Sequence, residues 1–151
     1  MKISSHVEKV GRLRALRRRL HPLDDFELWY WTTLTAGTNI LNATLHAAGV
    51  TRDDRVFSTI PGVHVVPQPD GSYARELRGL GDVSHVGWPP VEGDVPAHIR
   101  RLEGLLHGIE EHRDPCIRGD RHPTQAIVDE CESAFEAALS IFQCALPGGE
   151  R

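Results

Sequence analysis

The sequence predicts a mainly α-helical protein, an antiparallel four-helix bundle with a long, partly β crossover between the second and third helices. Four segments carry apolar residues at three- and four-residue spacing, which places them on one face of a helix. Residues 50–95, between the second and third segments, hold five prolines and six glycines, and this density excludes a long helix. With 151 residues, the chain is expected to form a single domain, residues 1–151, around its own hydrophobic core.

The first helix is predicted over residues 5–20. Ser5 and Glu8 have the spacing of a capping box, in which each side chain bonds to the other residue's backbone N–H. Pro22 ends the helix, because proline has no N–H to donate. One apolar stripe runs along this helix, and the arginines are expected on its other faces; the stripe consists of Val10, Leu13, Leu16 and Leu20.

This first segment is strongly basic. Residues 1–20 carry a net charge of +6, which leaves −10 for residues 21–151 of a chain whose net charge is −4. A basic arm on an acidic body can dock on that body, on a second subunit or on a polyanion. The negative charge of the whole chain gives no general reason to expect nucleic acid as a partner.

The second helix is predicted over residues 24–48, with Asp24 and Glu27 as a capping box and Gly49 just after its end. Residues 28–51 contain no Asp, Glu, Lys or Arg, whereas 25% of the chain is charged. We therefore expect both faces of this helix to be hidden from water. The apolar face consists of Phe26, Trp29, Tyr30, Ile40, Leu41 and Ala48.

The opposite face of the second helix is polar but neutral, as is typical of a buried, hydrogen-bonded surface. It either meets its own copy in a homodimer or lines a pocket that the crossover closes over a small ligand. Its asparagines, histidine and threonines argue against a membrane span, because each would need a partner in lipid. The predicted ligand-binding residues are those of this face and one from the crossover: Thr35, Asn39, Asn42, His46 and Trp88.

The crossover is expected to contain a β-hairpin. Residues 63–66 form a short β-prone run, Asp70-Gly71 is a turn signal, and residues 72–75 can return as the second strand. A structureless connection of this length is unusual in a compact domain unless it has a function.

The third helix is predicted over residues 96–113 with Asp94 as its N-cap. Gly104 and Gly108 lie opposite its apolar stripe and suggest a close backbone approach. The fourth helix is predicted from about residue 124 to Leu146. The stripes of the two helices are, in order, Ile99, Leu102, Leu105, Leu106 and Ile109, and then Ile127, Cys131, Ala134, Phe135, Ala138, Ile141, Phe142 and Ala145.

The crossover also holds the predicted catalytic residues, His64, Arg78, Asp82 and His85. A carboxylate at Asp82 can orient the His85 imidazole for base catalysis or metal ligation, since it fixes the tautomer. Nearby glycines would let a substrate approach the backbone. The alternative is structural: His64 as a hydrogen-bonded strand residue and His85 as a loop-packing residue.

A second cluster suggests a divalent metal as the cofactor. Glu103, His107 and Glu110 share one face of the third helix and provide carboxylate and imidazole ligands. The alternative is a solvated face with ordinary contacts between residues three and four positions apart.

The segment from Arg78 to His85 resembles the loose Arg-x(4–6)-His pattern of HEPN ribonucleases, which are small helical bundles. The resemblance implies that this Arg and His flank a cleft and act on RNA phosphodiesters. It covers eight residues, and the pattern recurs from Arg101 to His107.

Two functions therefore stand as hypotheses. The first is a dimeric binding or interaction module with a polar pocket or seam on the second helix. The second is an enzyme, either a metal-assisted hydrolase or an RNA-cleaving bundle, for which His46 and at least two crossover residues should converge on one pocket. No GxGxxG, P-loop or HExxH motif is present, and three cysteines without CxxC spacing indicate free thiols and a cytoplasmic location.

Overall fold

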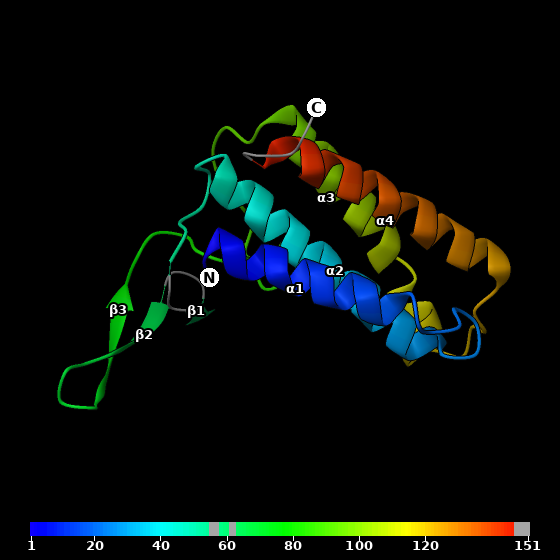
Figure 1. Cartoon of the computed structure of the whole chain (residues 1–151), viewed down its shortest axis with the longest axis horizontal. Coiled ribbons are helices and arrows are strands. Elements are labelled where there is room, and N and C mark those ends of the chain that lie inside the picture. Colours follow the sequence, from blue (N-terminus) through cyan, green and yellow to red (C-terminus); the bar gives the residue numbers. More distant parts are fainter. Residues whose placement is uncertain (55–57, 61–62, 147–151) are drawn as a thin grey trace.

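The computed structural model describes residues 1–54, 58–60 and 63–146, and it is mainly helical with a small antiparallel sheet (Figure 1). This confirms the predicted class and the hairpin between the second and third helices. The four helices are α1 (Ile3–Arg17), α2 (Phe26–Ala47), α3 (Ala97–Glu110) and α4 (Gln125–Ala145). A short π-helical segment, η1 (Asp114–Arg118), follows α3 where the sequence predicted only an end.

Helix α2 lies at the centre of the helical part. It contacts α1, α3 and α4, and α3 also contacts α4. Most of its residues are buried, but Leu28, Trp31 and Thr35 form an exposed stripe, and Ala48 at its end is exposed as well. The rest of the chain therefore leaves this stripe uncovered, and Trp31 and Thr35 border an open pocket. Only the predicted second subunit or ligand would hide it from water. Within the described residues, no helix is both long and apolar enough to cross a membrane.

The first three helices begin without the predicted side-chain caps. Ser5 already lies inside α1, where its N–H donates to the carbonyl of Lys2 (3.0 Å). The N-cap of α2 is Asp25 rather than Asp24, and its carboxylate accepts from the His21 N–H (2.8 Å). Helix α3 starts after Pro96 rather than after Asp94. By contrast, the predicted left-handed residue after α2 is confirmed, since Gly49 has φ of +69°.

The crossover forms a three-stranded antiparallel sheet in the order β1-β2-β3. Strands β2 (Val63–Pro67) and β3 (Tyr73–Leu77) pair as predicted, with Val65 opposite Arg75 and Val66 opposite Ala74. This hairpin projects away from the helices (Figure 1). The sequence missed β1 (Ser58–Ile60), because three residues are too few to show an alternating pattern.

One arginine of α1 is buried, contrary to the expected arrangement. Arg17 is 7% exposed, its Nε donates to Thr33 Oγ1 (2.8 Å), and its guanidinium pairs with Glu132. It also lies over the rings of Trp29 (4.7 Å) and Phe135 (4.6 Å). A buried arginine is tolerated here because its charge has both an anionic and an aromatic partner.

A contact that requires glycine occurs at Gly37 of α2, where the Leu106 side chain packs on the helix, and not at the two glycines of α3. A Cβ at Gly37 would lie 2.6 Å from Leu106 Cδ2, whereas a Cβ at Gly104 or Gly108 meets nothing within 4 Å. We expect Gly37→Ala to destabilise the protein by about 1–3 kcal/mol through overpacking. Gly104→Ala should instead stabilise it by about 1 kcal/mol, because alanine favours the helix. Urea denaturation of both variants checks the opposite signs, and equal effects would contradict this assignment.

Candidate functional site

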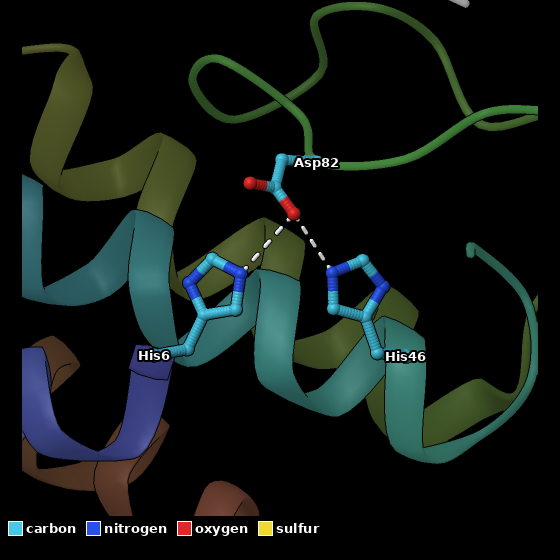
Figure 2. Close-up of side chains that lie close together, drawn as sticks. All are labelled: His6, His46 and Asp82. Carbon is cyan, nitrogen blue, oxygen red and sulfur yellow. Dashed lines mark hydrogen bonds and ion pairs between the residues drawn. The ribbon is translucent and has the colours of Figure 1, made fainter. Parts of the chain in front are cut away.

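Three buried side chains from three separate elements converge on one point. They are His6 of α1, His46 in the last turn of α2, and Asp82 on the loop after β3, and Figure 2 shows both rings directed at the carboxylate. Asp82 Oδ1 lies 2.9 Å from His46 Nε2 and 3.2 Å from His6 Nε2. All three side chains are at most 2% exposed. These residues are called the His–Asp cluster below.

Asn42 holds the loop that carries Asp82. Its amide nitrogen donates to the Val83 carbonyl (3.0 Å), and its amide oxygen accepts from the Val83 N–H (2.7 Å). Asn42 and His46 are four residues apart on α2, so they face the same side of the helix. Asn42 was predicted to bind a ligand, but its amide instead hydrogen-bonds the backbone of Val83 and so positions Asp82 next to His46.

Each histidine is oriented by a second hydrogen bond at its Nδ1 atom. His6 Nδ1 lies 2.9 Å from Asn39 Oδ1, and Asn39 Nδ2 donates to the Thr35 carbonyl (2.7 Å). Because that carbonyl can only accept, the amide oxygen of Asn39 faces His6, and His6 Nδ1 must carry the proton. His46 Nδ1 lies 2.7 Å from Thr51 Oγ1. With the His6 proton on Nδ1, a hydrogen bond from His6 Nε2 to Asp82 requires a second proton on the ring, and without that proton Nε2 presents a lone pair.

The Asp82 carboxylate is held in its charged form. Burial raises the pKa of this carboxyl group, but the hydrogen bonds from His46, His6 and the Met1 α-amino group, together with the charge of that amine, hold the pKa well below its usual range. All of these groups contact Oδ1. Oδ2 is buried and has no hydrogen-bond partner among the described residues.

The donor set of the His–Asp cluster suits a divalent transition-metal ion. One ligand atom from each of the three residues lies within 4.8 Å of the others, and no other such group occurs among the described residues. Two imidazole nitrogens and one carboxylate are ligands of zinc and of non-haem iron(II). Asn39 and Thr51 contact the Nδ1 atoms of the two histidines, as second partners do when they orient metal-binding histidines.

A pocket of about 240 Å³ borders the cluster. Two of the predicted catalytic residues, Asp82 and His85, line it, and so do three of the predicted ligand-binding residues, Thr35, Asn39 and Asn42. His46, which contacts Asp82, does not itself line the pocket, and Trp88 is 53% exposed outside the lining. The rest of the lining is formed by Met1, His6, Lys9, Trp31, Leu34, Thr38, Val83, Ser84, Glu110 and Arg113.

No family model, curated protein or solved structure matches this chain. Its function is therefore inferred from the geometry of the cluster and the pocket.

Two predicted catalytic residues lie outside this pocket. His64 is buried with its Nδ1 unpartnered among the described residues, and its ring packs beside Gly81. Arg78 forms ion pairs with Asp54 (2.7 Å) and Glu76 (2.8 Å). The segment from Arg78 to His85 is not helical, so it lacks the setting expected from the HEPN resemblance.

Asp82 does not orient His85, as its spacing suggested, because its contacts are with His6 and His46. The nearest carboxylate to His85 is Glu110, with Oε1 4.0 Å from Nδ1. In the predicted metal set on α3, His107 Nδ1 lies 3.5 Å from Glu110 Oε2, while Glu103 pairs with Arg100 (3.2 Å). These three residues do not bring three ligand atoms within 4.8 Å, since the helix spreads them along its surface.

Sequence reasoning missed His6 and Thr51. His6 precedes buried Val10 by one helical turn, so a signal was present: an uncharged polar residue in line with the apolar stripe of a basic helix. Thr51 gave no signal, because its role depends on how the chain turns after Gly49.

Proposed function

We propose that this protein is a metal-dependent hydrolase that holds one divalent transition-metal ion through His6, His46 and Asp82. The observation that carries the proposal is the convergence of three buried ligand atoms from three separate elements. His6 and His46 are 76 and 36 positions from Asp82 in the sequence, and both contact its buried carboxylate. Buried charges are paired or coordinate metals.

Three features of the cluster favour a metal ion over a purely structural hydrogen-bond network. Asn39 fixes the proton of His6 on Nδ1, which frees Nε2 to act as a ligand. The buried Oδ2 of Asp82 has unused acceptor capacity. The ion pair with His6 would otherwise require that ring to carry a second proton in the interior, where a charge is costly.

The pocket beside the cluster favours catalysis over a structural metal. Structural zinc ions have four protein ligands, whereas catalytic zinc ions have three and keep a position for water. A metal in such a site lowers the pKa of its bound water towards neutrality and supplies a nucleophile for hydrolysis. His85, with Glu110 near its Nδ1, lines the same pocket and is the candidate for proton transfer.

A metal-dependent hydrolase combines the predicted polar pocket on α2 with the predicted metal-assisted hydrolysis. The polar face of α2 is retained as a pocket wall, and the metal-assisted hydrolase is preferred to RNA cleavage because Arg78 is engaged by Asp54 and Glu76. The packing of α2 against the other three helices supports an antiparallel four-helix bundle as the proposed architecture. The homodimer stays a prediction, which the mass in solution tests.

Elemental analysis combined with zinc titration tests the metal site. We expect the purified protein, stripped with a chelator, to bind one zinc ion per chain and to gain thermal stability on binding, because metal that binds only the folded state stabilises it. Binding of less than about one-tenth of an ion per chain at saturating zinc would contradict the proposal. A colorimetric screen of small esters and amides with and without zinc then tests hydrolysis.

A further inference from the structure

We propose that the pocket beside the His–Asp cluster binds a small organic carboxylate, whose charge is recognised by Lys9 and Arg113. The inference rests on the proposed metal site and names the class of ligand that this site takes. Both side chains line the pocket that Asp82 borders, and they come from different elements, α1 and the connection after α3.

The ammonium group of Lys9 is a positive charge at the pocket that pairs with no carboxylate of the described residues. It follows His6 by three positions on α1, so the two side chains lie on neighbouring parts of one helical face. Its ammonium donates to the Met1 sulfur (3.3 Å), and a thioether is only a weak acceptor. No carboxylate of the described residues lies within ion-pair distance of Lys9, which leaves its other donors for a ligand.

Arg113 is only loosely engaged by its neighbours. Its Nη1 lies 4.0 Å from Glu110 Oε1, and its Nε lies 3.3 Å from Asp114 Oδ1. A guanidinium group has five N–H donors in a planar fork that matches a carboxylate. Arg113 can therefore bind a ligand carboxylate in addition to Glu110 and Asp114.

The charge balance of the pocket favours an anion. Two acidic residues line it, and both already have cationic or imidazole partners. Asp82 contacts His6, His46 and the Met1 α-amino group, while Glu110 is shared by His85, His107 and Arg113. A divalent ion at the cluster adds two positive charges to those of Lys9 and Arg113. An anionic ligand offsets this excess.

The size and walls of the pocket favour a small organic acid over an inorganic anion. At about 240 Å³ the pocket has room for a small organic molecule. Trp31, Leu34 and Val83 provide apolar wall, which a purely polar anion cannot use. A short apolar group would lie against these three side chains.

Isothermal titration of zinc-loaded protein with isobutyrate, isobutyramide and inorganic phosphate tests this assignment. We expect isobutyrate to bind about tenfold or more tightly than isobutyramide, its neutral analogue, because a charge-assisted hydrogen bond is stronger than a neutral one. Lys9→Met and Arg113→Met should each weaken isobutyrate binding about tenfold. The control variants Lys2→Met and Arg101→Met remove one charge each outside the pocket and should change it less than about twofold.

Equal binding of the acid and its amide, or equal effects of the pocket and control variants, would overturn the inference. Tighter binding of phosphate than of isobutyrate would overturn the organic carboxylate as the ligand class. Failure of the metal proposal is distinguishable, because it appears as missing zinc before any ligand is added. Isobutyrate is then titrated onto metal-free protein, where dependence on Lys9 and Arg113 still decides the carboxylate assignment.

Discussion

Replacing Asp82 with asparagine should reduce zinc affinity more than about 100-fold. Loss of an outer-shell partner alone typically costs 10–100-fold, and Asp82→Asn removes the only negative charge among the three ligands. Asparagine has nearly the same shape, so the loop pinned by Asn42 should keep its position. His6→Ala and His46→Ala should have effects of similar size, because each leaves two ligands. Zinc titration of the stripped variants gives the affinities, and circular dichroism reports whether the helices persist.

A histidine outside the cluster provides the control for these variants. His98 is exposed on α3, so His98→Ala should bind zinc as the wild type does. If the three cluster variants also bind like the wild type, the cluster is a hydrogen-bond network and the metal proposal fails. The same conclusion would follow if the lost zinc matched only the fraction of unfolded protein.

Replacing Asn42 with leucine should both destabilise the protein and weaken the metal site. Leucine has a similar volume but leaves the buried N–H and C=O of Val83 without partners. An unsatisfied buried group costs about 1–3 kcal/mol, so the metal-free variant should lose about 2–4 kcal/mol of unfolding free energy. Since Asp82 precedes Val83, zinc affinity should also fall about 10–100-fold. Urea denaturation and zinc titration measure the two effects.

Thr38→Val is the matched control for Asn42→Leu. Thr38 lines the same pocket from the same helix, but its hydroxyl donates only to the Leu34 carbonyl one turn earlier (3.1 Å). Its replacement should cost less than about 1 kcal/mol and leave zinc affinity unchanged. An Asn42→Leu variant that behaved like Thr38→Val would show that the side-chain amide does not position the loop.

Periodicity and turn chemistry predicted most of the fold. The apolar stripes located the helices to within a few residues, and Asp70-Gly71 marked the hairpin turn, where Gly71 has φ of +83°. The first residues of the helices were less predictable. Ser5 and Asp24 were expected to cap the first two helices, but Lys2 and Asp25 occupy the N-cap positions and form no side-chain cap hydrogen bond. Arg17 shows a further limit: its burial depends on Glu132 and Phe135, which are distant in the sequence.

The candidate site was only partly visible in the sequence. The lack of charge on α2 marked Asn42 and His46 as buried polar residues, and Asp82 stood out in the crossover. The partners were not visible, because His6 joins them only when α1 packs against α2. The sequence therefore paired Asp82 with His85, three residues away, while the fold pairs it with histidines on two helices.

The most direct test of the metal site is anomalous diffraction from crystals of the zinc-loaded protein, measured on both sides of the zinc absorption edge. We expect one strong anomalous peak at about 2.0–2.2 Å from His6 Nε2, His46 Nε2 and a carboxylate oxygen of Asp82. A peak beside Glu103, His107 and Glu110, or no peak in fully loaded protein, would contradict the account.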